Sequence, residues 1–110
     1  MAEVGLDEVL IALANPSRRA VVELLALGPA TVTKTADHVG LSLPAIDRHL
    51  DILVAAGLIQ RRKHGRTNFL AIRRAGLRLL RDWIARFNVD WGSDEETLEN
   101  YLDSLTSQIE

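Results

Sequence analysis

The stretch from Val32 to Ile72 limits the possible folds of this chain to very few. It begins with two helical patterns, and the break between them is only Gly40-Leu41-Ser42. Two short strand-like runs follow, Leu58–Lys63 and Thr67–Ile72, on either side of His64-Gly65-Arg66. The sequence therefore predicts a helix, a tight turn, a second helix and a hairpin, without any long connection.

The second helical pattern carries its own start and stop signals. Ser42 is a favourable N-cap, Pro44 is tolerated in the first turn, and Gly57 suits the end of a helix, as Gly40 does for the helix before. Four apolar residues at helical spacing are expected to face a core: Ile46, Leu50, Leu53 and Val54. The opposite face is left to solvent or a ligand and carries Ala45, Asp47, Arg48 and Asp51.

The hairpin is strongly basic. Four positive charges fall within six residues: Arg61, Arg62, Lys63 and Arg66. A charge run alone is most often a solvated face, but beside a helix-turn-helix it is placed to lie along phosphates. We therefore predict a mostly α-helical fold with a small β-hairpin, a winged helix-turn-helix that holds its second helix in a DNA groove.

A series of residues in one order and spacing covers most of the chain, roughly Leu6 to Phe87. The series is Leu13-Ala14-Asn15-Pro16-Ser17-Arg18, Ala36, Gly40-Leu41-Ser42, Pro44-Ala45-Ile46, Arg48-His49-Leu50, Leu53, Ala56-Gly57-Leu58-Ile59 and Gly65-Arg66. Through it the chain resembles the ArsR-type (SmtB/ArsR) bacterial transcriptional regulators. The resemblance implies a homodimeric repressor that binds a palindromic operator and leaves it when an effector is sensed.

Composition sets limits on the class of protein. With 110 residues and 47% hydrophobic content, one folded domain is expected. The absence of cysteine excludes disulfides, thiol sensors and thiolate metal sites. No apolar run approaches a membrane span and the N-terminus has no signal-peptide pattern, so a cytoplasmic location is expected.

The net charge of -2 conceals an uneven distribution. Residues 41–87 hold ten Arg or Lys against three Asp, whereas residues 88–110 hold seven acids and no base. Because attraction to phosphates is local under physiological screening, the basic central segment predicts DNA binding better than the overall balance does.

Two helices are expected before the DNA-binding segment, at Leu6–Ala14 and from Asn15-Pro16-Ser17 to about Leu27. The resemblance places the first at the dimer interface and the second in the core. Arg18 has two interpretations. It either caps or forms an ion pair near Glu23 or Asp37, or it contacts a DNA phosphate.

The first helix of the DNA-binding pair is expected from about Thr33, as N-cap, to Val39. In the second helix, Asp47 and Asp51 stand where the family more often has Ser and Lys, and three interpretations are open. The two carboxylates pair with Arg48 or the wing arginines, or Asp47 accepts from a cytosine amino group, or DNA binding has weakened or been lost.

A longer helix is expected from Arg74 to Phe87, and its apolar surface is too wide for one small core. Part of it is therefore expected to meet a second chain. In metal-sensing members of the family this helix carries Asp, His and Glu ligands. Here it has Asp82 and no histidine, so metal sensing is not expected.

The C-terminal residues follow a break at Asn88–Gly92. Ser93-Asp94-Glu95-Glu96 is a capping box, and four apolar residues follow at helical spacing: Leu98, Leu102, Leu105 and Ile109. We assign residues 1–92 to the winged domain and 93–110 to an amphipathic helix that packs on the first helix or on the dimer partner. A further hypothesis is that its acidic face competes with DNA for the basic wing.

No enzyme motif is present: there is no cysteine nucleophile, no Gly-rich phosphate loop and no recognisable Ser, His and carboxylate arrangement, and no cofactor is expected. The main hypothesis is a sequence-specific DNA-binding transcriptional regulator, a repressor that does not sense metal by the usual sites. The alternative is a winged-helix protein-interaction module with weak or no DNA binding. Expected partners are a double-stranded operator and a second copy, with an effector or protein partner left open.

The candidate DNA-binding residues lie on the second helix and the wing: Ser42, Pro44, Ala45, Asp47, Arg48, His49, Lys63, Arg66 and Thr67. The candidate dimer-interface residues are apolar side chains of the terminal helices: Leu6, Leu10, Leu77, Leu80, Trp83, Ile84, Phe87, Leu98, Leu102 and Leu105.

Overall fold

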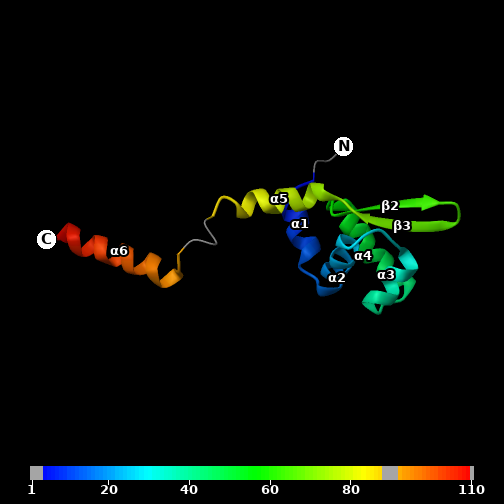
Figure 1. The fold of residues 1–110 in the computed structure, drawn as a ribbon, viewed down its shortest axis with the longest axis horizontal. Coiled ribbons are helices and arrows are strands. Elements are labelled where there is room, and N and C mark those ends of the chain that lie inside the picture. The colour runs from blue at the N-terminus through cyan, green and yellow to red at the C-terminus, as the bar shows by residue number, and fades with distance from the viewer. Residues whose placement is uncertain (1–3, 88–91, 110) are drawn as a thin grey trace.

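A computed structural model describes residues 4–87 and 92–109, and Figure 1 shows the arrangement of their helices and strands. In chain order the elements are α1 (Leu6–Leu13), α2 (Pro16–Ala26), β1 (Ala30–Thr31), α3 (Val32–Val39), α4 (Leu43–Ala55), β2 (Ile59–His64), β3 (Thr67–Ile72), α5 (Arg74–Ile84) and α6 (Asp94–Ile109). The predicted class, a mostly α-helical chain with a β-hairpin behind a helix-turn-helix, is confirmed.

The hairpin of β2 and β3 forms the wing. The predicted bounds of β3 are confirmed, whereas β2 begins and ends one residue later than predicted. Its strands pair from Ile59 opposite Ile72 to His64 opposite Thr67, so the turn is only Gly65-Arg66. Gly65 has a φ of +64°, which suits the first position of a tight turn that twists with its strands.

The sheet has a third strand that the sequence did not reveal. β1 pairs antiparallel with β3, Ala30 opposite Leu70, so β3 lies in the middle of the sheet. A strand of two residues carries no alternation that periodicity can detect. By pairing with β3, it ties the wing to the chain just before α3.

Side-chain and glycine caps define the two helices of the DNA-binding pair. The Ser42 hydroxyl accepts from the amide of Ala45 at 3.3 Å, and Gly40 ends α3 with a φ of +80°, both as predicted. The predicted N-cap of α3 was wrong. Thr31 caps it by accepting from the amide of Lys34 at 3.0 Å, because Thr31 is still extended whereas Thr33 is already helical.

The core lies between the first four helices and the sheet. Ile46, Leu50 and Leu53 of α4 are fully buried, as predicted, but Val54 is 37% exposed. The prediction for Val54 was wrong because one residue turns a helix by about 100°, which carries this side chain past the buried arc. Thr35 is also fully buried, and its hydroxyl donates to the carbonyl oxygen of Thr31 at 2.8 Å, so no polar group is left unsatisfied there.

A close backbone contact seats the start of α5. The amide of Gly76 donates to the carbonyl oxygen of Gly57 at 2.9 Å, and a Cβ on Gly76 would lie 2.6 Å from the carbonyl oxygen of Ala56. α5 also packs on α1. Position 76 therefore requires glycine, because there is no room for a Cβ atom.

The predicted end of α5 at Phe87 was wrong, since the helix ends at Ile84. The amides of Arg86 and Phe87 donate to the carbonyl oxygens three residues back, Trp83 and Ile84, at 3.2 and 3.0 Å. This tighter turn closes the helix.

The capping box at the start of α6 is confirmed. The amide of Glu96 donates to the Ser93 hydroxyl at 3.1 Å, and the Glu96 carboxylate accepts from the amide of Ser93 at 3.0 Å. Every described side chain of α6, from residue 94 to 107, is exposed. Apart from Gly92, the predicted break at Asn88–Gly92 lies outside the described residues. No helix in the described part of the chain is long and apolar enough to cross a membrane.

Candidate nucleic-acid interface

The start of α4 and the wing tip present most of the candidate DNA-binding residues to solvent. Ser42, Pro44, Ala45 and Arg48 are exposed, as are the three wing residues Lys63, Arg66 and Thr67. Asp47 and His49 are half-buried. An exposed helix face capped at its N-terminus beside a basic hairpin matches the geometry by which winged helices meet a groove and its flanking phosphates.

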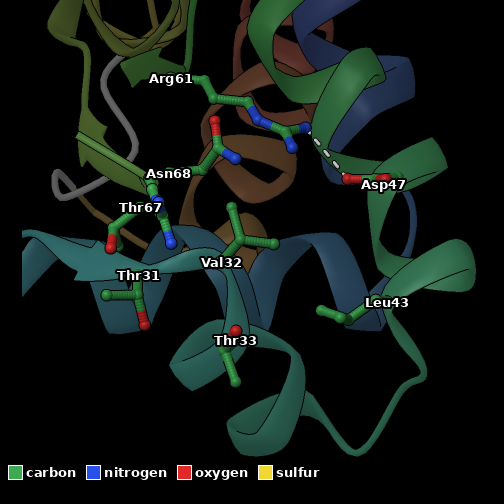
Figure 2. Close-up of a pocket in the computed structure, with 9 residues that line it drawn as sticks. Thr31, Val32, Thr33, Leu43, Asp47, Arg61, Thr67 and Asn68 are labelled. Carbon is green, nitrogen blue, oxygen red and sulfur yellow. Dashed lines mark hydrogen bonds and ion pairs between the residues drawn. The ribbon is translucent and has the colours of Figure 1, made fainter. Parts of the chain in front are cut away.

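A groove of about 280 Å³ separates α4 from the wing (Figure 2). Its walls come from the end of β1, the start of α3, the first half of α4, and the strands and turn of the wing: Thr31, Val32, Thr33, Leu43, Asp47, Arg61, Arg66, Thr67 and Asn68. Three predicted residues, Asp47, Arg66 and Thr67, thus line one groove. The predicted residues Ser42, Pro44, Ala45, Arg48, His49 and Lys63 are not among its walls.

Thr31, Thr33, Leu43, Arg61 and Asn68 extend this surface beyond the predicted residues. Arg61 belongs to the basic run of the hairpin but is not among the predicted DNA-binding residues. The threonines could not be found, because only the pairing of β1 with β3 brings the start of α3 to the wing.

An ion pair bridges the groove. Nη1 of Arg61, on β2, donates to Oδ1 of Asp47, on α4, at 3.0 Å, and Figure 2 shows the arginine reaching across from the wing. The interpretation that the carboxylates of α4 pair with wing arginines is therefore confirmed for Asp47. Asp51 is exposed and takes part in no ion pair within the described residues.

The side chain of Arg18 contacts both the end of α1 and α4. Its Nε donates to the carbonyl oxygen of Ala12 at 2.7 Å and its Nη2 to that of Ile11 at 3.1 Å, so it caps the end of α1. The expected capping role is confirmed, and no ion pair to Glu23 or Asp37 is formed. Arginine side chains suit this position because their fork of donors serves several acceptors at once.

His49 is the third partner of Arg18. Its Nδ1 lies 3.2 Å from Nη1 of Arg18, and since a guanidinium only donates, Nδ1 accepts and the ring is neutral with its proton on Nε2. Burial lowers the pKa of His49 below its usual 6.5, and the charges of Arg18 and Arg48 lower it further. The imidazole thus links the recognition helix to the end of α1.

The candidate dimer residues differ in how much of them the single chain already covers. Leu6, Leu77 and Leu80 are half-buried, and the two α5 leucines pack against the chain's own core. The others are exposed: Leu10, Trp83, Ile84, Phe87, Leu98, Leu102 and Leu105. The exposed side chain of Ile11 (64%), which the sequence analysis did not include, adds to the α1 part of this surface.

The residues on α5 do not fit a metal centre. Asp82 pairs with its neighbour Arg81 at 3.0 Å, and in the described residues no group of three or more potential ligands (His, Cys, Asp or Glu) comes together. A metal ion needs several such donors converging on one point.

Comparison with known proteins agrees with this geometry. The family model described as "Bacterial regulatory protein, arsR family" matches residues 15–61, which span α2 to the beginning of the wing. The chain is also 36% identical to an ArsR family transcriptional regulator of known crystal structure, with a TM-score of 0.69 over 74% of this chain and 84% of that one. The chain belongs to the ArsR family.

Other ArsR relatives and neighbours extend the comparison. The chain is 38% identical to the HTH-type transcriptional regulator Rv2034 of Mycobacterium tuberculosis, over 74% of this chain and 76% of the relative. It is 29% identical to the transcriptional repressor SdpR of Bacillus subtilis, over 74% and 91%. A homodimeric winged helix-turn-helix DNA-binding domain from Mycobacterium bovis is 25% identical, with a TM-score of 0.61 over 90% of this chain and 82% of that one. The first two are a transcriptional regulator and a transcriptional repressor, and the third is a DNA-binding domain, which supports a DNA-binding regulator.

Proposed function

We propose that this ArsR protein is a homodimeric repressor that binds a palindromic operator through two copies of α4 and of the wing. The observation that carries the proposal is the exposed, Ser42-capped face of α4 directly beside the basic hairpin, with one groove between them. In a dimer the two recognition helices would enter successive major grooves about 34 Å apart. A repressor so placed acts on the chromosome in the cytoplasm, without an enzymatic step.

Two kinds of contact are assigned to the interface. The exposed start of α4 supplies contacts with base edges, from Ser42 to Arg48, with Arg48 as the main hydrogen-bond donor. The wing supplies phosphate contacts through Lys63, Arg66 and Thr67, because a two-residue turn places these side chains at its tip. His49 is bonded to Arg18, so we assign it a role in positioning α4.

The proposed dimer forms through apolar side chains of the terminal helices. Leu10 of α1, Trp83 and Ile84 of α5, and Phe87 just beyond α5 are exposed in the single chain, and a second copy would cover them. Trp83 and Phe87 contact one another edge to face, with ring centroids 5.1 Å apart, and together present one aromatic surface. The leucines of α6 extend this surface, since none of its described side chains is covered within the chain.

Fluorescence anisotropy tests the proposal. The probe is a duplex from upstream of the coding region, the competitor is a scrambled duplex of equal composition, and each is titrated at two salt concentrations, with and without zinc. We expect selective binding that falls steeply with salt, because each phosphate contact releases counterions, and that does not respond to zinc. Equal weak binding to both duplexes at low salt would contradict an operator-binding function, and a zinc response would contradict metal independence.

A further inference from the structure

The ion pair between Arg61 and Asp47 joins two separate elements of the proposed DNA interface. It links β2 of the wing to the recognition helix α4, at 3.0 Å, across the groove described above (Figure 2). The other ion pair in the described part of the chain, Arg81 with Asp82, joins two neighbours on one helix. Among the described residues, Arg61 and Asp47 therefore form the one charged link between the two elements that are proposed to contact DNA.

The pair also changes the charge that the interface offers to DNA. A free guanidinium on the wing would be available to any phosphate, whereas this one is neutralised by a carboxylate and held in a fixed place. Both side chains remain partly exposed, at 31% for Arg61 and 51% for Asp47. A pair this exposed adds little to folding stability, so its consequence lies in binding.

We propose that Asp47 is a specificity-determining residue that acts by positioning Arg61 rather than by contacting a base. It withholds the arginine from the phosphates of arbitrary DNA and fixes the wing at one distance from α4. The inference rests on the proposed DNA-binding function and assigns a role to a carboxylate on the helix that is proposed to enter the groove.

Two physical effects of the pair act in the same direction on specificity. Non-specific binding consists almost entirely of phosphate contacts, so withholding one arginine lowers it. Operator binding needs the helix and the wing in place together, and a wing already held by α4 loses less freedom on binding. The ratio of operator to non-specific affinity therefore rises through both effects.

Asp51 supplies a matched control. It lies one turn further along α4, is exposed, and takes part in no ion pair within the described residues. Removing either carboxylate removes one negative charge from the same helix, but only removal of Asp47 releases an arginine. If Asp47 acted only by repelling phosphates, D47A and D51A would have the same effect.

The experiment compares two duplexes, an operator selected from a random pool by the wild-type chain and a scrambled version of it. Anisotropy at a series of salt concentrations gives affinity and salt slope for wild type, D47A, D51A, D47E and the double variant D47A/R61Q. For D47A we expect non-specific affinity to rise by about three- to tenfold at low salt and the slope to steepen by about 0.9, as for one additional phosphate contact. Operator affinity should fall by about two- to fivefold, as for the loss of one exposed ion pair.

The other variants test the mechanism. D51A should leave the salt slope and the specificity ratio close to wild type, and D47E should retain both because its carboxylate still pairs with Arg61. The double variant should return the salt slope to the wild-type value, since no arginine is left to be released. Thermal unfolding of each variant is the control, and we expect all of them to be folded at the assay temperature.

Three results distinguish a failure of the proposed function from a failure of the inference about Asp47. If the wild-type chain selects no sequence, the proposed function itself is wrong. If it does select an operator but D47A and D51A shift both affinities equally, the positioning role of Asp47 is wrong. If D47A loses operator affinity with an unchanged slope and no gain on scrambled DNA, Asp47 contacts a base, and the inference is overturned.

Discussion

Replacing Arg18 with alanine should destabilise the fold without removing a DNA contact. The guanidinium donates to the carbonyl oxygens of Ala12 and Ile11, at 2.7 and 3.1 Å, and to Nδ1 of His49 at 3.2 Å. A hydrogen bond with a charged donor contributes about 1.5–3 kcal/mol, and the side chain is only half-buried, so we take the lower end. The two carbonyl bonds, at about 1.5 kcal/mol each, then give a loss of about 3 kcal/mol in the free energy of unfolding.

The assay is urea unfolding followed by circular dichroism, at one fixed protein concentration. Arg19→Ala is the matched control, because Arg19 is the next residue, is exposed, and makes one bond to the end of α1, from Nη1 to the carbonyl oxygen of Leu13 at 2.8 Å. It should lose less than about 1 kcal/mol. Arg18→Lys should fall between the two, since an ammonium group cannot reproduce the fork of the guanidinium.

The same variants bear on the alternative role of Arg18 as a phosphate contact. A positioning role leaves the salt slope of DNA binding unchanged in Arg18→Ala, whereas loss of a phosphate contact lowers the slope by about 0.9. An Arg18→Ala chain as stable as wild type, with a lower salt slope, would refute the reasoning.

Further predictions concern the rest of the chain. Because the folded state lowers the pKa of His49 below 6.5, its contribution to stability is complete above pH 6.5 and is lost as pH falls through the lower folded pKa. His49→Gln should therefore reduce the pH dependence of the urea-unfolding midpoint across this range. An unchanged pH dependence would refute the assignment. Gly76→Ala should cost about 1–3 kcal/mol of stability, since its Cβ would meet the carbonyl oxygen of Ala56 at 2.6 Å. The control is Ala75→Gly at the exposed neighbouring position, which measures the difference in helix propensity between alanine and glycine without the clash. In anisotropy titrations, Arg66→Ala should weaken binding to all sequences about equally, whereas Arg48→Ala should cost about 1–3 kcal/mol in a sequence-dependent way; the opposite pattern would exchange their roles. Removing residues 93–110 should tighten DNA binding if the acidic helix competes for the wing, and unchanged or weaker binding by a still-dimeric truncation would reject that hypothesis.

Local signals in the sequence predicted most of the elements, because caps and periodicity act over a few residues. Ser42 and Gly40 marked the helix ends that the structure has, and the Ser93 and Glu96 capping box formed as expected. The errors came from features that contacts decide. Thr31 caps α3 because β1 holds it extended, and Val54 lies at the edge of a buried arc whose width depends on the neighbouring elements.

The candidate site shows the same division. The basic wing and the polar face of α4 could be predicted, because charge and spacing are properties of the sequence alone. Which carboxylate meets which arginine could not be predicted, since Asp47 and Arg61 are fourteen positions apart and the pairing depends on where the hairpin lies against the helix.

Composition and signals between near neighbours are enough to predict the class of fold, the order of its elements and the basic segment. The contacts that join Arg18 at the end of α1 to His49 on α4, and Arg61 to Asp47 across the groove, are visible only in the folded chain. Both links join residues far apart in the chain. Their hydrogen bonds can form only after packing of the core has set the distance between the elements that carry the donor and the acceptor.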